Sequence, residues 1–408
     1  MTLTQISSSR SGWLTAGLCF LVALLEGFDL QSAGMAAAGI SAEFRLTPAQ
    51  LGWLFSAGLL GLLPGALFGG MLADRFGRKR VLLCAVLLFG LASVGTACAW
   101  DLASLLLSRF LTSAGIGAAL PLVIALASES AAPEHRSLAV SVTFCGMPLG
   151  GACAAALGMT GGLSDWRLVF YVGGFAPIGV AFMLAFWLPE SRMFRQQVLQ
   201  QQLDGNAPVA NFSELFAGGL WRSTLLLWLS SFFTLTVLYM LMNWLPSLLL
   251  GHGFGRQVVG QVQILFNLCG ACAAVLTGRL LDRGHVARTV CLGYGAILAG
   301  LAGLGLGTNT LAILAAGAVV GYGLMCGQAI LYAVAPTLYC TRVRGTGVGL
   351  SVAVGRLGSI GGPLVAGTLL SAGVGIGGIV MAVVPGIIIA AGGAYALLGR
   401  RAASGSSQ

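Results

Sequence analysis

Charged residues are scarce in this sequence, and one type is almost missing. Asp, Glu, Lys and Arg together make up 8% of the 408 residues, and Lys79 is the single lysine. A soluble domain is typically about one quarter charged, because its surface faces water. Such a low content excludes a soluble enzyme, a nucleic-acid-binding protein and a disordered scaffold. We therefore expect the lipid bilayer as a partner and no nucleic acid.

Long hydrophobic runs take the place of the missing charges. Hydrophobic residues make up 57% of the chain, and the mean hydropathy is +0.92. A helix needs roughly 20 apolar residues to cross the hydrocarbon core, whereas a porin-like barrel has alternating segments of about ten residues. The continuous runs predict an all-α membrane protein with twelve transmembrane helices. The predicted spans are 13–38, 50–72, 81–99, 103–127, 138–161, 168–188, 222–249, 258–280, 289–307, 310–333, 346–370 and 375–398.

An internal repeat divides the chain into two halves. Gly-Met-Leu-Ala-Asp-Arg from Gly70 matches Gly-Arg-Leu-Leu-Asp-Arg from Gly278, an offset of 208 residues, and the same offset pairs Gly150 with Gly358. Parallel repeats of this kind are typical of secondary transporters, whose substrate site lies between the repeats. We predict two pseudo-symmetric six-helix bundles, 1–190 and 221–408, joined by a polar cytoplasmic linker, 191–220.

The distribution of basic residues predicts the orientation. With both termini in the cytoplasm, 16 of the 21 Lys and Arg residues fall on the cytoplasmic side and only three on the other. The positive-inside rule favours this arrangement.

Nine of the ten cysteines lie inside predicted spans, and Cys269 and Cys272 form a CxxC without a second pair at zinc spacing. We therefore expect no metal site and no cofactor, and we read these cysteines as small packing residues.

Three segments of the sequence resemble the major facilitator superfamily. The segment 69–80, Gly-Gly-Met-Leu-Ala-Asp-Arg-Phe-Gly-Arg-Lys-Arg, is similar to the superfamily's loop between the second and third helices, and the segment that begins at Arg109 resembles its fourth-helix motif. Glu26-Gly-Phe-Asp29 resembles the first-helix motif of the aromatic acid/proton symporters, which more often have aspartate at both positions. The resemblance implies a monomeric transporter of the bacterial inner membrane. Its substrates would be protons and a small aromatic carboxylate, such as a hydroxyphenylpropionate, and import would proceed by alternating access.

Four charged residues, Glu26, Asp29, Arg109 and Arg356, lie inside predicted spans and away from the span ends. Each costs roughly 2.5–3.5 kcal/mol at the bilayer centre, so each calls for a function. Glu26 and Asp29 share one helix face about 5–6 Å apart, and at an effective dielectric of 20 they repel by roughly 3 kcal/mol. Such a pair can take up a proton near neutral pH. We predict Asp29 as the proton-coupling carboxylate and Glu26 as its modulator. The alternative is that both stay ionised, pair with arginine and serve packing alone.

The two arginines are permanently charged and suited to bind a carboxylate. We predict that Arg356 holds the substrate carboxylate and that Arg109 exchanges partners among Asp29, Glu129 and the substrate. Fixed interhelical salt bridges are the alternative for both arginines.

An aromatic substrate also needs an apolar slot with a few polar points. Tyr239, Asn243, Trp244, Gln328 and Tyr332 are the candidate residues, and Asn243 or Gln328 would bind a ring hydroxyl. The alternative for each of them is an interhelical hydrogen bond or a place at the membrane interface.

Charged residues at the cytoplasmic helix ends form a predicted gate that holds this side closed. They are Asp74, Arg75, Arg78, Glu129, Asp282, Arg283 and Arg344. The alternative is that these charges only set the orientation of the chain in the membrane, although Asp74 and Asp282 do not contribute to the positive-inside rule.

Three other functions compete with proton-driven import. A proton-coupled exporter of aromatic compounds or drugs uses the same residue types, since direction is poorly encoded in sequence. A ligand-binding membrane receptor is disfavoured because we find no soluble signalling domain. An intramembrane enzyme is disfavoured because HExxH, a serine–lysine pair and a nucleophile elbow are all missing from the sequence.

Overall fold

The computed structural model describes residues 3–131, 136–160, 166–190, 220–339 and 344–405. Within these ranges it contains twelve helices long and apolar enough to cross a membrane, one for each predicted span. The first half holds α1 (Leu3–Phe44), α2 (Pro48–Phe76), α3 (Arg78–Ala97), α4 (Leu102–Ser130), α5 (Arg136–Thr160) and α6 (Arg167–Trp187). The second half holds α8 (Leu220–Gly251), α9 (Arg256–Asp282), α10 (Val286–Leu306), α11 (Thr310–Val334), α12 (Arg344–Ser371) and α13 (Ile376–Gly405), with a short 3-10 helix, η4 (Ala335–Thr337), after α11.

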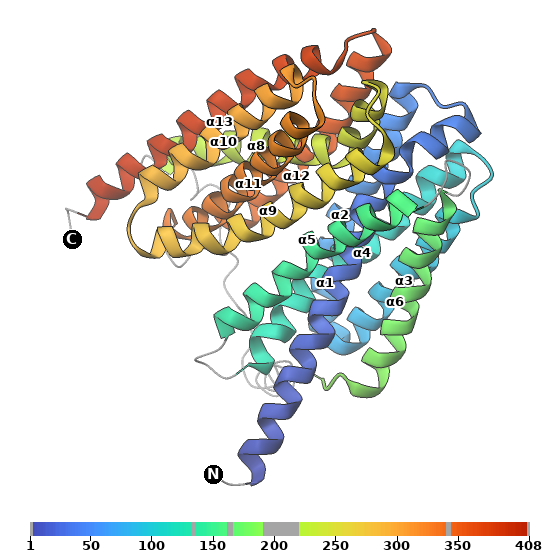
Figure 1. Cartoon of the computed structure of the whole chain (residues 1–408). Coiled ribbons are helices and arrows are strands. Elements are labelled where there is room, and N and C mark those ends of the chain that lie inside the picture. Colours follow the sequence, from blue (N-terminus) through green and yellow to red (C-terminus); the bar gives the residue numbers. More distant parts are fainter. Residues whose placement is uncertain (1–2, 132–135, 161–165, 191–219, 340–343, 406–408) are drawn as a thin grey trace. The chain divides into compact units, whose positions relative to one another are not determined.

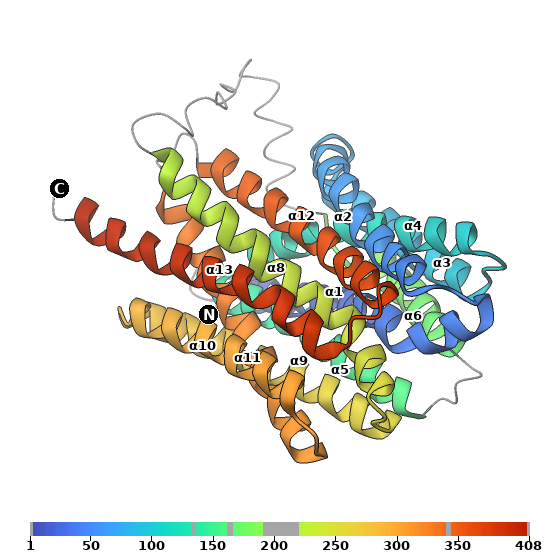
Figure 2. The same ribbon diagram turned by 90° about the horizontal axis from the view of Figure 1, so that it is seen from above.

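The helices form two compact units. Unit 1 is built from α1–α6, apart from Thr47–Gly52 at the start of α2, which group with unit 2. Unit 2 is otherwise built from α8–α13. Figures 1 and 2 show the course of the helices in each unit.

Both units pack their helices in the same scheme. In unit 1, α1 packs against α4, α5 and α6, and α3 packs against α4 and α6. In unit 2, α8 packs in the same way against α11, α12 and α13, and α10 packs against α11 and α13. Side-by-side pairs such as α3 with α6 and α10 with α11 can be followed in both ribbon views (Figures 1 and 2). Helix α1 therefore corresponds to α8, α3 to α10, and so on through the chain.

Glycine contacts show that the 208-residue offset holds residue by residue. A Cβ on Gly115 would meet the carbonyl oxygen of Ala85 at 2.7 Å, and one on Gly323 would meet that of Gly293 at 2.8 Å. These are equivalent pairs, because 115 and 85 become 323 and 293 when 208 is added. Small residues let membrane helices approach closely, and the repeat preserves these approaches.

The same equivalence holds between the helices that carry Gly150 and Gly358. A Cβ on Gly150 would lie 1.8 Å from the carbonyl oxygen of Leu24, and one on Gly358 would lie 2.2 Å from that of Phe232. Leu24 and Phe232 are again 208 residues apart. Glycine is required at both positions because the backbones of α1 and α5, and of α8 and α12, touch there.

Polar anchors lie at one end of unit 1. Asp101 caps α4 by accepting a hydrogen bond from the Ser104 amide, and this bond lowers the pKa of Asp101. Arg167 forms a two-pronged ion pair with Glu43 at 2.6 and 2.8 Å and donates to the carbonyl of Ala97 at 2.9 Å. This pair ties the end of α1 to the start of α6 and the end of α3.

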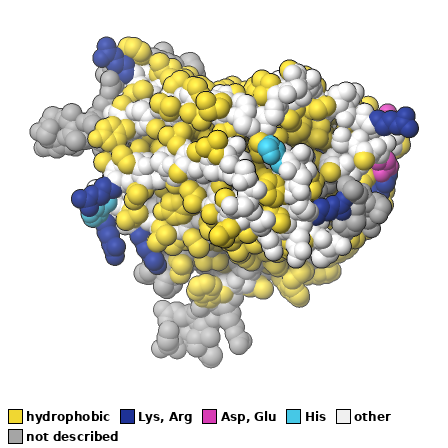
Figure 3. Space-filling view, turned by 45° about the horizontal axis from the view of Figure 1, so that its top comes forward, with side chains coloured by type: hydrophobic (Ala, Val, Ile, Leu, Met, Phe, Trp, Pro, Cys, Tyr) yellow, Lys and Arg dark blue, Asp and Glu magenta, His cyan; other side chains and the backbone are white. Residues whose placement is uncertain are grey.

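Hydrophobic side chains cover most of the face drawn in Figure 3, and the Lys and Arg side chains lie mostly toward its edges. Large exposed residues include Leu67, Phe182, Leu311 and Met381. A surface of this kind suits lipid, because the interior of a bilayer offers nothing to solvate a charge.

Candidate substrate and proton site

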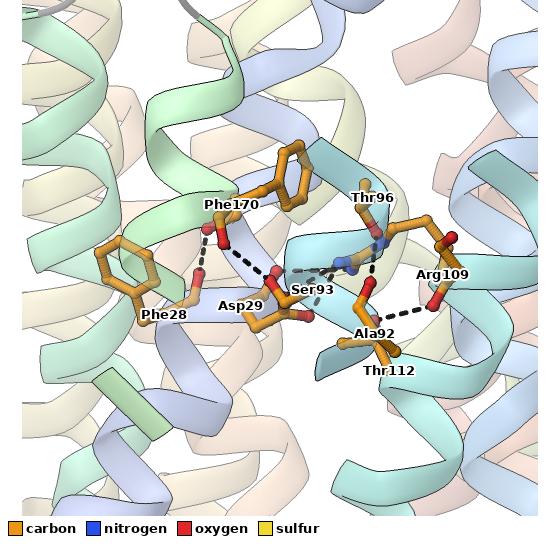
Figure 4. Close-up of polar contacts among 10 residues, drawn as sticks. Phe28, Asp29, Ala92, Ser93, Thr96, Arg109, Thr112 and Phe170 are labelled. Carbon is orange, nitrogen blue, oxygen red and sulfur yellow. Dashed lines mark hydrogen bonds and ion pairs between the residues drawn. The ribbon is translucent and has the colours of Figure 1, made fainter. Parts of the chain in front are cut away.

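The centre of unit 1 contains a buried ion pair. Asp29 of α1 is fully buried, and Nη1 of Arg109 from α4 lies 2.9 Å from its Oδ2 and 3.1 Å from its Oδ1. The Arg109 side chain is only 4% exposed. Because a buried charge is costly without an opposite charge, the two groups hold each other in the apolar bundle (Figure 4).

Two residues from neighbouring helices complete the surroundings of this pair. The Ser93 hydroxyl of α3 lies 3.1 Å from Oδ1 of Asp29 and 3.2 Å from the carbonyl oxygen of Phe170 in α6. The Phe170 ring lies under the Arg109 guanidinium, 5.5 Å from ring centroid to Cζ, a cation–π contact. Four helices therefore meet at Asp29, as the labelled side chains in Figure 4 show.

Glu26 precedes Asp29 by three residues on α1 and is also fully buried. The structure thus brings Asp29 and Arg109 together and places Glu26 inside the same bundle. Glu129, the other predicted partner of Arg109, forms an ion pair with Arg78 instead. Of the two carboxylates predicted as partners of Arg109, Asp29 is the one bonded to it in this structure.

A second polar cluster lies in unit 2, where α8 meets α12. Nη1 of Arg356 donates to the hydroxyl of Tyr239 at 2.9 Å, and its guanidinium also lies 5.8 Å from the centroid of the Tyr239 ring. Tyr239 is buried and Arg356 is half-buried. A tyrosine hydroxyl that accepts this bond still has its own proton to donate, so the cluster offers a permanent cation and a neutral donor side by side.

The other predicted slot residues bond to groups of the protein. Asn243 donates from Nδ2 to the carbonyl of Tyr239 on its own helix at 2.8 Å. Trp244 is buried and donates from Nε1 to the carbonyl of Pro363 on α12 at 3.0 Å. Gln328 donates to the hydroxyl of Tyr332 one turn later on α11. Asn243 is therefore bonded to Tyr239, the partner of Arg356, whereas Gln328 makes its hydrogen bond on a different helix.

The predicted gate residues fall into two groups. Arg78, at the start of α3, pairs with Glu129 near the end of α4, and the backbone amide of the adjacent Lys79 donates to Glu190 after α6. Within unit 1 these contacts tie together the cytoplasmic ends predicted for α3, α4 and α6. The exposed members are Asp74, Arg75, Asp282 and Arg283. The side chain of Arg344 lies outside the described part of the chain.

Sequence reasoning missed Ser93 and Phe170. A serine or a phenylalanine inside an apolar helix is common, so neither residue type signals a site. Only the packing of α3 and α6 against α1 places them beside Asp29.

Comparisons with known proteins agree with this architecture. The family model of the Major Facilitator Superfamily matches residues 19–363. The 3-(3-hydroxyphenyl)propionate transporter of Escherichia coli (strain K12) is 48% identical over 98% of this chain and 97% of its own length. The 4-hydroxybenzoate transporter of Pseudomonas aeruginosa is 34% identical, over 88% of this chain and 87% of its own length.

A solved structure supports the fold independently. The crystal structure of a D-xylose–proton symporter superposes with a TM-score of 0.73 at 18% identity, covering 95% of this chain and 96% of that one. With twelve apolar helices in two units of equal packing, this chain is a multi-pass membrane transporter and belongs to the Major Facilitator Superfamily.

Proposed function

We propose that this protein imports an aromatic carboxylate, 3-(3-hydroxyphenyl)propionate or a close analogue, together with protons across the bacterial inner membrane, with both termini cytoplasmic. The identity of 48% over nearly the whole chain to a transporter of that compound supports the substrate class. The buried Asp29–Arg109 pair supports proton coupling, and it is the observation that carries the mechanism.

The mechanism follows from the charge of this pair. When Asp29 takes up a proton, Arg109 keeps its positive charge and loses the negative partner that neutralised it. The cation then attracts an anion, so proton uptake and carboxylate binding favour each other. On the inside Asp29 loses its proton and pairs with Arg109 again, and release of the substrate follows. Glu26, three residues away, modulates this titration through its own charge.

In this proposal Arg356 holds the substrate carboxylate, and Arg109 exchanges partners among Asp29, Glu129 and the substrate during the cycle. The Arg356 guanidinium can give two parallel hydrogen bonds to a carboxylate, and the Tyr239 hydroxyl adds a neutral donor beside it. A tyrosine ring also matches the aromatic part of the substrate. Asn243, which lies one turn after Tyr239, provides an amide for a ring hydroxyl.

The test is uptake of labelled 3-(3-hydroxyphenyl)propionate into proteoliposomes, with and without an imposed pH gradient, in competition with benzoate and 4-hydroxybenzoate. We expect the labelled substrate to accumulate only when the imposed gradient makes the outside more acidic than the inside. Asp29→Asn should abolish accumulation but keep exchange of labelled for unlabelled substrate. Asp101→Asn is the matched control, because Asp101 is an exposed carboxylate and asparagine also caps helices.

Each outcome has a clear meaning. Absence of uptake by folded wild-type protein rejects the named substrate. Full accumulation by Asp29→Asn removes Asp29 from the coupling. Gradient-driven efflux in exchange for protons, without accumulation, identifies the exporter.

A further inference from the structure

The Ser93 hydroxyl lies between two acceptors. Its Oγ is 3.1 Å from Oδ1 of Asp29 on α1 and 3.2 Å from the carbonyl oxygen of Phe170 on α6, and the residue is fully buried (Figure 4). A hydroxyl has one proton and two lone pairs. It therefore donates to only one of these oxygens at a time and can accept a hydrogen bond from another group.

The two protonation states of Asp29 need opposite partners. The ionised carboxylate is an acceptor only, so Ser93 donates to Oδ1 and the Phe170 carbonyl keeps its own helical bonding. A protonated Asp29 has an O–H that needs an acceptor. Ser93 Oγ lies at the same 3.1 Å for that role, and its own proton then turns to the carbonyl of Phe170.

We infer that Ser93 is a positioning residue for the coupling carboxylate, whose hydroxyl reverses its hydrogen bond when Asp29 gains a proton. A proton arrives on Oδ1 of Asp29. The Ser93 hydroxyl keeps its own proton and rotates, and no heavy atom has to move. The reversal adds a hydrogen bond from α3 to α6 in the protonated state. This inference rests on the proposed function, since it assumes that Asp29 is the carboxylate that takes up the proton.

The charges around Asp29 leave few other causes for a pH effect. Arg109 from α4 contacts Asp29, and Glu26 lies three residues before it on α1. The charged residues of α3 and α5 lie in the first turns of those helices, and that of α6 is Arg167, which is bonded to Glu43. Within the described residues, α3 and α6 therefore face Asp29 with neutral groups only, the Ser93 hydroxyl and the Phe170 carbonyl.

Removing the hydroxyl affects the two protonation states unequally. The ionised carboxylate keeps both bonds from Arg109, so each oxygen still has a donor. The protonated carboxyl loses the acceptor for its O–H, and a buried donor without an acceptor carries the full cost of its desolvation. Ser93→Ala therefore favours the ionised state. We expect the pH of half-maximal uptake to fall by about one unit, which is a tenfold rise in the proton concentration required.

The experiment measures initial uptake of 3-(3-hydroxyphenyl)propionate in proteoliposomes as a function of outside pH. The variants are Ser93→Ala and Ser93→Thr, which keeps the hydroxyl and should keep the wild-type midpoint. Thr96→Val is the matched control, because Thr96 is buried on the same helix and its hydroxyl bonds only to Ala92 of that helix. Infrared spectra of the same samples should show the band of the protonated Asp29 carboxyl, and this band should be absent in Asp29→Asn. Among Ser93→Ala, Ser93→Thr and Thr96→Val, only Ser93→Ala should displace it.

The outcomes separate this inference from the proposed function. If wild-type uptake shows no dependence on pH, the proton coupling itself fails. If wild-type uptake depends on pH and Ser93→Ala has the same midpoint and the same carboxyl band, the inference is overturned and the coupling stands. An equal shift in Thr96→Val would also overturn it, since any lost hydroxyl would then suffice. If Ser93→Ala does not fold, Ser93→Cys replaces it, and because a thiol is a weak donor and acceptor, its midpoint should move in the same direction.

Discussion

The buried pair of Asp29 and Arg109 makes a quantitative prediction about stability. The two side chains are 0% and 4% exposed, and their closest atoms are 2.9 Å apart. Removing one partner of such a pair leaves an uncompensated buried charge and costs about 3–5 kcal/mol. Asp29→Asn and Arg109→Gln should each lose stability by this amount. The double variant has no buried charge at this position and should be more stable than either single variant.

Thermal unfolding of the purified protein in detergent measures the effect. For a folding unit of this size, 1 kcal/mol changes Tm by about 2–4 °C, so each single variant should unfold about 6–20 °C below the wild type. The deficit of Arg109→Gln should shrink as the pH falls, because its unpaired Asp29 takes up a proton from solution and becomes neutral. The deficit of Asp29→Asn should persist, because arginine stays protonated.

An exposed ion pair in the same unit provides the control. Glu43 and Arg167 approach to 2.6 Å, but their side chains are 40% and 32% exposed. Exposed pairs contribute about 1 kcal/mol or less, so the corresponding cycle of Glu43→Gln and Arg167→Gln should give a coupling of that size. Additive losses in the double variant of Asp29 and Arg109, or equal coupling in both pairs, would show that the buried pair does not stabilise the bundle as a unit.

Two further predictions concern ligand binding and helix packing. Tyr239→Phe removes the hydroxyl that accepts a hydrogen bond from Arg356. Because one hydrogen bond to a charged group is lost, this change should raise the KM for uptake about tenfold with little change in maximal rate. An unchanged KM would exclude the hydroxyl from substrate binding. Gly150→Ala should lower Tm, since its Cβ would lie 1.8 Å from the carbonyl oxygen of Leu24, whereas Gly179→Ala, with no heavy atom within 4 Å, should leave Tm unchanged.

The helices were accessible from the sequence because hydropathy alone decides which segments enter a bilayer. Every predicted span corresponds to one helix of the structure. The largest difference is at the first helix, predicted over 13–38 and found over Leu3–Phe44. The excess includes polar residues such as Gln5 and Ser7, because a helix continues past the hydrocarbon core once its hydrogen bonds are formed.

The charged part of the site was accessible for a related reason. Four charged residues stand out because they lie away from the ends of the predicted spans: Glu26, Asp29, Arg109 and Arg356. The Arg109–Asp29 bond joins residues 80 positions apart, and which carboxylate the arginine reaches depends on how α1 and α4 are rotated against each other. The sequence predicts that Arg109 exchanges partners among Asp29, Glu129 and the substrate, and the structure shows it paired with Asp29.

Neutral partners were beyond sequence reasoning for a different reason. The carbonyl of Phe170 carries no information in its residue type, and the hydroxyl of Ser93 resembles others in apolar helices that bond to their own backbone, as that of Thr112 does. The role of Trp244 was left open for the same reason. Its indole donates to a backbone carbonyl of α12, a contact that depends on the register of two helices.

The 208-residue equivalence shows how charge is divided between the two units. The positions of Glu26, Asp29 and Arg109 correspond in unit 2 to Thr234, Val237 and Gly317. Thr234 is buried and shares a hydrogen bond with the hydroxyl of Tyr294 at 3.0 Å, so a neutral pair replaces a carboxylate there. A buried charge is retained only where it has a use, because it is expensive in every other place. Among the described residues the two fully buried carboxylates, Glu26 and Asp29, both lie in unit 1, whereas Arg356 of unit 2 donates a hydrogen bond to the hydroxyl of Tyr239. In the proposed function the protonation step therefore belongs to unit 1, while Arg356 supplies a permanent positive charge that suits an anionic substrate.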